Sequence, residues 1–199
     1  RRLGKLYVLA SHFHPDHFNK EVLQWREQRP DIIYIFSKDI LRHRRGQKED
    51  AVWLKKGEEY KDETLSVRAF GSTDVGVSFL LQASGKKIFH AGDLNNWHWM
   101  DESTEAEWKG AEKNFLHELD DLYAYTPEVD VAMFPVDPRL GKEYMRGAGQ
   151  FVTKIKTHIF VPMHFTPEYA KANAFRDFAE AHGVRFVSLT HRGQKIEIE

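Results

Sequence analysis

Short apolar runs rich in β-branched and aromatic residues recur along the chain, and most are bounded by Gly, Asp, Ser or Pro. Runs of this kind predict β-strands. The predicted strands cover residues 6–10, 32–36, 51–54, 65–70, 75–81, 87–90, 129–134, 158–163, 185–189 and 195–198. The stretch Ala83-Ser84-Gly85 predicts a hairpin turn between two of these strands.

Other segments place their apolar side chains at helical spacing. They predict helices over residues 18–27, 106–122, 148–155 and 168–182. The last follows Thr166-Pro167, a capping residue and a Pro suited to the first helical turn. Residues 51–90 hold strands without helices, whereas strands and helices alternate elsewhere. This order predicts an α/β sandwich of two mixed sheets flanked by helices, as a single domain over residues 1–199.

Composition narrows the possible chemistry. The 199 residues carry 29 basic and 30 acidic side chains, so no strong net field attracts nucleic acid or an anionic membrane. The chain has no cysteine, so a metal would have to use histidine and carboxylate ligands. The apolar runs are too short to cross a membrane, and the first residues lack a signal-peptide core. We therefore expect a cytoplasmic protein.

The densest chemistry lies in the stretch SHFHPDH, residues 11–17, directly after the first predicted strand. In an extended segment His12 and His14 point to the same side. Pro15 then turns the chain, so that Asp16 and His17 can face the same cavity. Four ligand-type side chains split in this way suit two adjacent metal ions better than one.

This stretch resembles the His-x-His-x-Asp-His signature of the metallo-β-lactamase fold superfamily. The segments FHAGDLN and FVPMHF resemble its strand-end Gly-Asp and its late strand ending in a histidine. The sequences of both segments are most similar to those of the metal-dependent hydrolases related to ascorbate-phosphate lactonases. The resemblance implies an αββα fold with two divalent ions, zinc first, at one edge between the sheets. The implied ligands are His12 and His14 for the first ion, and Asp16, His17 and His164 for the second, with Asp93 bridging.

Two departures from the family pattern stand out. Ser72 occupies the place where a further histidine is expected, and Asp74 follows two residues later. Asp74 either supplies an oxygen ligand or is only a turn residue. His90 is a rival ligand, or it hydrogen-bonds a ligand from behind. A carboxylate at the first position would shift the preference from zinc toward manganese or iron.

The second departure is at the beginning. The fold normally opens with strands well before the histidine motif, and here only residues 1–6 precede Tyr7. Either the chain is a fragment or an upstream segment is absent, and without those strands one sheet would be short, with an uncovered edge.

Candidate substrate contacts follow two of the predicted strands. Asn96, Trp97 and His98 lie just after Asp93, although the tryptophans can instead pack on the following helix. Asp137 and Arg139 follow another strand, where Arg139 can hold a phosphate or carboxylate or form a structural ion pair with Asp137.

These features predict a metal-dependent hydrolase in which a metal-bridged hydroxide attacks a small anionic ester, lactone or phosphodiester. Asp16 or Asp93 would orient the water or move its proton. A nuclease acting on RNA or DNA is one alternative, which the neutral charge does not favour. A redox or structural dinuclear metalloprotein is the other. The oligomeric state stays open.

Overall fold

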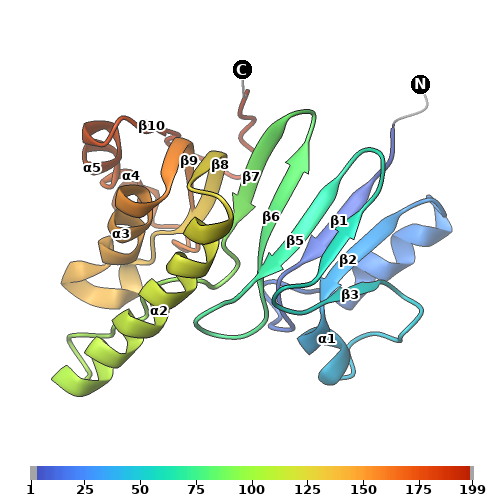
Figure 1. Cartoon of the computed structure of the whole chain (residues 1–199), viewed down its shortest axis with the longest axis horizontal. Coiled ribbons are helices and arrows are strands. Elements are labelled where there is room, and N and C mark those ends of the chain that lie inside the picture. The colour runs from blue at the N-terminus through green and yellow to red at the C-terminus, as the bar shows by residue number, and fades with distance from the viewer. Residues whose placement is uncertain (1–3, 198–199) are drawn as a thin grey trace.

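Three parallel strands form the smaller sheet. The computed structural model describes residues 4–197 and orders this sheet β1 (Tyr7–Ala10), β2 (Ile33–Ser37) and β3 (Val52–Leu54). The 3-10 helix η1 (Lys20–Glu27) and the short helix α1 (Lys38–Arg42) lie beside it (Figure 1). Tyr34 and Phe36 point toward one face of β2 and pack with Ile40 of α1, whereas Ile33 and Ile35 point to the opposite face.

Seven strands form the larger sheet, in the order β10-β9-β8-β7-β6-β5-β4. The antiparallel part consists of β4 (Glu59–Lys61), β5 (Ser66–Phe70), β6 (Ser78–Ala83) and β7 (Lys86–His90). The parallel part adds β8 (Glu128–Pro135), β9 (Lys156–Met163) and β10 (Arg185–Phe186). Ser84 and Gly85, with φ of 50° and 76°, form the predicted turn between β6 and β7.

Helices cover the outer face of the larger sheet (Figure 1). They are α2 (Glu105–Tyr125), the 3-10 helix η2 (Pro138–Glu143), α3 (Arg146–Lys154), α4 (Tyr169–Asn173) and α5 (Arg176–Ala181). A capping box between Thr104 and Glu107 starts α2. Phe115 of α2 and Phe151 of α3 are fully buried against Phe134 of β8, which makes this helix–sheet layer the largest core.

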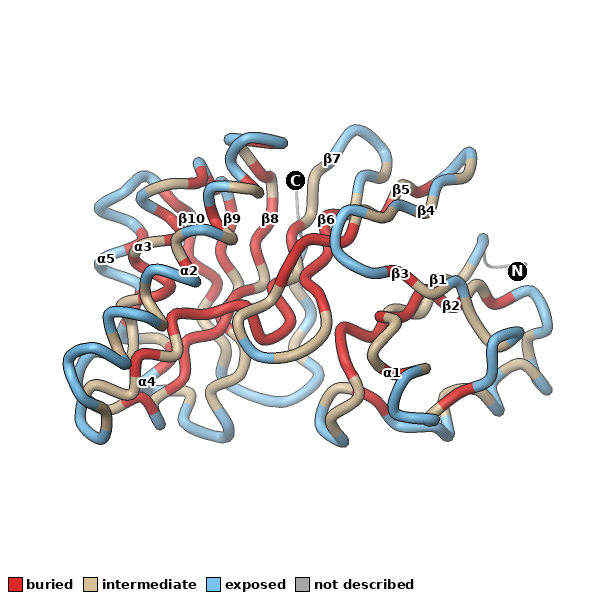
Figure 2. The backbone as a smooth tube through the Cα atoms, turned by 60° about the horizontal axis from the view of Figure 1, so that its bottom comes forward, coloured by how far each residue is buried: buried red, intermediate tan, exposed pale blue. Residues whose placement is uncertain are grey.

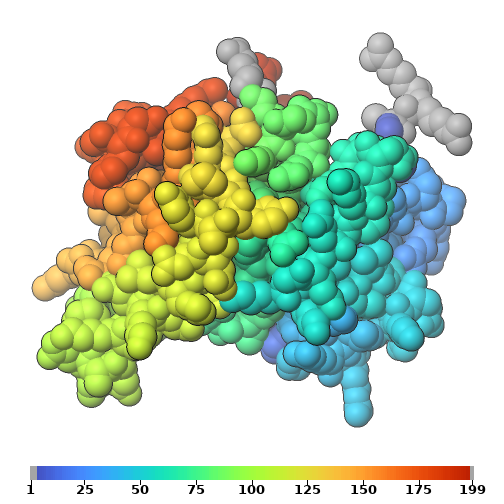
Figure 3. Space-filling view, in the orientation of Figure 1, coloured from blue at the N-terminus to red at the C-terminus, as the bar shows by residue number. Residues whose placement is uncertain are grey.

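A second apolar layer joins the two sheets. Ile35 and Leu54 of the smaller sheet pack with Val67 and Phe79 of the larger one. In Figure 3 the blue segments at the right, which belong to the smaller sheet, lie beside the turquoise part of the larger sheet. Figure 2 shows buried backbone running along the strands, with exposed positions on the outer helices and loops. The layers therefore follow the predicted order of helix, sheet, sheet and helix.

Several details differ from the sequence prediction. Both pairs of the smaller sheet are parallel, so only the larger sheet is mixed. The strand predicted from residue 75 begins at Ser78, because Gly76 has a φ of 77° that an extended strand does not allow. The segment 168–182 forms two short helices, α4 and α5, instead of one. Of the strand predicted at 195–198, residues 195–197 form no strand, and residue 198 lies outside the described part. Within residues 4–197, no helix is long and apolar enough to cross a membrane.

Candidate metal centre

The histidine motif forms a tight loop at the end of β1. The backbone amides of His17 and Phe18 both donate to the carbonyl of His14, at 3.0 and 2.8 Å, which closes the turn predicted at Pro15. Ser11 Oγ lies 3.0 Å from Nδ1 of His12, and this hydrogen bond leaves Nε2 free to face the site. His12 is fully buried. The loop therefore fixes His12 in the interior, with His17 partly buried beside it and His14 more exposed.

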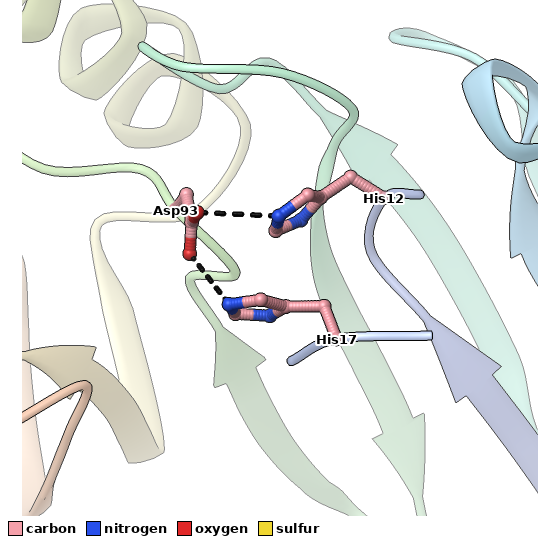
Figure 4. Close-up of side chains that lie close together, drawn as sticks. All are labelled: His12, His17 and Asp93. Carbon is pink, nitrogen blue, oxygen red and sulfur yellow. Dashed lines mark ion pairs between the residues drawn. The ribbon is translucent and has the colours of Figure 1, made fainter. Parts of the chain in front are cut away.

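Asp93 lies at the centre of three imidazoles. Its Oδ2 is 3.2 Å from His12 Nε2, and its Oδ1 is 3.1 Å from His17 Nε2 and 3.5 Å from His164 Nε2 (Figure 4 shows the first two pairs). Gly92 allows this approach, because a Cβ there would lie 2.8 Å from Ser11 Cβ. Burial raises the pKa of Asp93, but the adjacent imidazoles of His12 and His17 outweigh it and hold the pKa well below its usual range.

The donor atoms at this centre fit divalent metal ions. Among residues 4–197, the buried atoms His12 Nε2 and Asp93 Oδ1 have no hydrogen bond of good geometry. Such orphaned atoms are costly unless a ligand satisfies them. In the described part of the chain, three groups have ligand atoms within 4.8 Å of one another: His12, His17 and Asp93; Asp16, His17 and His164; and His14, Asp74 and Asp93. Imidazole and carboxylate donors in this number suit zinc, manganese or iron.

Asp74 reaches the site from the loop before β6. Its Oδ2 lies 3.9 Å from His14 Nδ1. The amide of Val77 donates to the carbonyl of Ser11 at 3.0 Å, which ties this loop to the histidine motif. Ser72, in the place of the expected histidine, accepts a 3.4 Å hydrogen bond from the amide of Asp74. The arrangement favours Asp74 over His90 as the further ligand beside His14.

His164 is oriented from behind by Asp137. His164 Nδ1 lies 2.9 Å from Asp137 Oδ2, so its Nε2 faces Asp93. Arg139 Nη2 donates to the same carboxylate oxygen at 2.6 Å. Burial raises the pKa of Asp137, yet the bonds from His164 and Arg139 lower it to about 2. Asp137 is itself fully buried, so its predicted role as a substrate contact is wrong: it positions a metal-ligand candidate.

A cavity of about 360 Å³ opens over the cluster. It is lined by His14, Asp16, Thr73, Asp74, Asp93, Trp97, Trp99, Arg139 and His164. Trp97 Nε1 donates to the carbonyl of Asp93 at 2.8 Å, which fixes its ring at the wall. Trp99 lines the cavity beside Trp97, and Thr73 is a lining residue that the sequence prediction did not include.

The structure corrects the prediction for three further residues. Asn96 is buried, and its Nδ2 donates to Glu112 and Gln150 at 3.0 and 2.9 Å. His98 is also buried and lies 3.2 Å from the carbonyl of Glu143, so neither residue reaches the cavity. His90 Nδ1 accepts from the amide of Gly92 at 3.1 Å and thereby supports the backbone before Asp93, not a ligand side chain. Burial, with the neighbouring His17, lowers the pKa of His90 to about 4.

Comparison with known proteins identifies the fold. No protein-family model and no curated protein matches the sequence. Igni18, a metallo hydrolase from the hyperthermophilic archaeon Ignicoccus hospitalis, matches with a TM-score of 0.63 at 18% identity, over 92% of this chain and 76% of that one. The metallo-β-lactamase fold protein YhfI from Bacillus subtilis matches with a TM-score of 0.58 at 12% identity, over 92% and 75%. CmlA, a diiron β-hydroxylase from Streptomyces venezuelae, gives 0.61 at 13%, over 94% and 44%. The chain thus has the metallo-β-lactamase fold, as the sequence predicted.

Proposed function

We propose that the protein is a hydrolase that depends on two divalent metal ions and acts on a small anionic ester, lactone or phosphodiester. The observation that carries this proposal is the buried Asp93 carboxylate, which three imidazoles surround. Its Oδ1 and the Nε2 of His12 are buried atoms without a hydrogen-bond partner among the described residues, so both are available to a metal ion. The description of Igni18 as a metallo hydrolase on the same fold supports the proposal.

The proposed mechanism divides roles between the two aspartates. Divalent ions at the cluster would polarise the scissile carbonyl or phosphoryl oxygen and lower the pKa of water at the site. Asp93 stays ionised because its pKa lies well below the usual range, so it holds charge and does not take up a proton near neutral pH. Asp16 lines the cavity with an exposed carboxylate. We propose that Asp16 accepts a proton from the attacking water. Asp16 then donates this proton to the departing oxygen as the ester bond breaks.

The identity of the ions depends on Asp74. With His14 and Asp93 it forms a group of one imidazole and two carboxylates, beside the fully buried His12. Oxygen donors favour harder ions than an all-imidazole set does. We propose zinc as the ion of the His17 and His164 position, with manganese or iron competing at the Asp74 position.

Metal content and turnover test this proposal together. We expect about two metal ions per purified chain and hydrolysis of at least one of bis(4-nitrophenyl) phosphate, a homoserine lactone or a carboxylic ester. His12→Ala and Asp93→Asn should lose both metal and turnover, whereas the controls His158→Ala and Asp177→Asn, which change exposed residues elsewhere, should lose neither. The proposal fails if the loaded protein turns over none of the three while the two site variants keep their metal.

A redox metalloprotein is the second candidate function. The observation that favours it is the extra carboxylate of Asp74, together with the fold that the diiron β-hydroxylase CmlA shares. Two iron ions per chain with a spectrum that changes on reduction, and no hydrolysis, would support this candidate. No feature of the described residues favours the predicted nuclease alternative. Turnover of RNA or DNA in the same assay would support it.

A further inference from the structure

Two tryptophans form one wall of the cavity over the metal cluster. Side chains of the loop after Asp93 alternate in direction: Asn96 and His98 are buried, whereas Trp97 and Trp99 line the cavity. The two indole rings stack with 16° between their planes and 6.3 Å between their centres. Trp99 adopts a left-handed φ of 44°, a strained conformation for a large side chain. The loop is thus held in a conformation that turns both rings toward the site.

Arg139 is a pre-positioned cation in the same cavity. Asp137 binds its Nε at 3.0 Å and its Nη2 at 2.6 Å, so the guanidinium is fixed in place. Among residues 4–197, no hydrogen-bond partner is found for its Nη1. About half of the side chain is exposed, at 54%. A fixed guanidinium with a free edge is suited to a carboxylate or phosphate oxygen.

The charge of the cavity depends on the metal ions. Asp16, Asp74 and Asp93 give the lining three carboxylates. Two divalent ions would outweigh these three charges, and the charge of Arg139 is balanced by Asp137. The loaded cavity therefore attracts anions, and its apolar surface comes from the tryptophan wall.

We propose that the site selects substrates in which a flat π-system adjoins the anionic group, the ring lying against Trp97 and Trp99 and the anion bonding Arg139. This inference rests on the proposed hydrolase function, since it names the substrate class of the same centre. A flat ring gains dispersion and electrostatic contact on an aromatic wall that a saturated ring of similar size does not gain. A small aliphatic acid would contact only the metal ions and Arg139, without contact to the tryptophan wall.

Binding of simple probes tests this selection without turnover. We would titrate metal-loaded protein with benzoate, cyclohexanecarboxylate, acetate and benzyl alcohol, using calorimetry and tryptophan fluorescence. Acetate has the carboxylate without the ring, benzyl alcohol the ring without the charge, and cyclohexanecarboxylate a ring that is not flat. We expect benzoate to bind about tenfold more tightly than each of the other three.

Variants separate the two parts of the proposal. Trp99→Leu should lower the affinity for benzoate to nearly that for acetate. The control Trp25→Leu, at an exposed tryptophan outside this cavity, should leave the preference for benzoate unchanged. Arg139→Met should weaken benzoate about tenfold and leave benzyl alcohol unchanged. Arg139→Lys should restore part of the loss, and the control Arg185→Met should change nothing.

The outcomes distinguish this inference from the proposed function. Equal binding of acetate and benzoate to wild-type protein would overturn the inference, and so would an equal loss of both in Trp99→Leu. Protein that binds no metal would instead contradict the proposed function. If metal-loaded protein prefers benzoate but hydrolyses no ester, the inference on ligand selection is supported and only the proposed hydrolase function is contradicted.

Discussion

At the scale of the residue, Asp74 is where this chain departs from the ligand pattern that its histidine motif implies. Its carboxylate lies 3.9 Å from His14, on a loop bonded to Ser11. Asp74→His replaces an oxygen donor by an imidazole, so we expect the ratio of zinc to manganese affinity to rise about tenfold. Competition between the two ions, followed by calorimetry, measures that ratio.

Ser72 offers the matched control for this substitution. Ser72→His places the imidazole where the family pattern expects it and leaves the carboxylate of Asp74 in place. If Asp74 is a ligand, this second variant should change the ratio less than Asp74→His does. An unchanged ratio in Asp74→His would show that Asp74 is only a turn residue.

Gly76 sets how closely the two ligand loops approach. A Cβ at this position would lie 2.1 Å from the carbonyl oxygen of Ser11 and 2.5 Å from His12 Cβ, on a backbone with φ of +77°. We expect Gly76→Ala to lower the free energy of unfolding by more than about 2 kcal/mol, because backbone strain and overpacking add. Denaturant unfolding of the metal-free protein measures the loss.

Gly85 separates the two causes. It has nearly the same φ, +76°, but a Cβ there would meet nothing within 4 Å. Gly85→Ala should therefore cost about 1–2 kcal/mol, from backbone conformation alone. Equal losses in the two variants would mean that the approach to Ser11 and His12 carries no cost.

The candidate ligands were predictable from sequence to different degrees. His12, His14, Asp16 and His17 are contiguous, so their geometry follows from local chain direction and one proline. The role of Asp137 was not predictable, because it depends on a hydrogen bond to His164 that only the pairing of β8 with β9 creates. The burial of Asn96 similarly depends on Glu112 and Gln150, on two different helices.

At the scale of the element, Glu112 links α2, α3 and the loop after Asp93. Its carboxylate accepts hydrogen bonds from Asn96, Gln150 and Arg146. The bond from Arg146 is the main cause that lowers the pKa of Glu112 below its usual 4.5. This network anchors the helices to the loop that carries the tryptophan wall.

The lowered pKa gives a pH dependence with a definite sign. A carboxylate with a lowered pKa in the folded state stabilises the fold above its unfolded pKa, and the contribution is lost as pH falls through the folded value. Glu112→Gln should therefore cost about 1–2 kcal/mol near neutral pH, and the difference from wild type should shrink in acid. Unfolding measured across pH tests this. The control Glu105→Gln, exposed on the same helix, should stay within about 0.5 kcal/mol throughout.

Long elements were predicted, whereas two of the short ones, β4 and α1, were missed. The helix α2 and the strands β8 and β9 have enough residues for a clear apolar period. The strand β4 and the helix α1, with three and five residues, have no such period and were not predicted. Their form depends on neighbours: β4 pairs with β5, and Ile40 of α1 is buried against the smaller sheet.

At the scale of the whole molecule, the candidate ligands come from both sheets. His12 and His17 follow β1 of the smaller sheet, whereas Asp93 and His164 follow β7 and β9 of the larger one. Metal bound by both groups would hold the layers together in the folded state only. We expect metal at a hundredfold excess over its Kd to raise the free energy of unfolding by about 2.7 kcal/mol.

Thermal unfolding with and without a chelator measures this linkage. Chelator should lower the melting temperature of the wild type and of His158→Ala, a change at an exposed residue remote from the cluster. It should have little further effect on Asp93→Asn, whose central carboxylate is gone. A melting temperature of the wild type that does not respond to metal would contradict the linkage.

The positions of the ligands along the chain also have a consequence for biosynthesis. His12, His17 and Asp93 are synthesised before β8, whereas the group that needs His164 is complete only after β9. At ordinary translation rates the delay between Asp93 and His164 is on the order of several seconds. The nascent chain therefore holds six of the seven candidate ligands before His164 is made, and the position that needs His164 can be completed only afterwards.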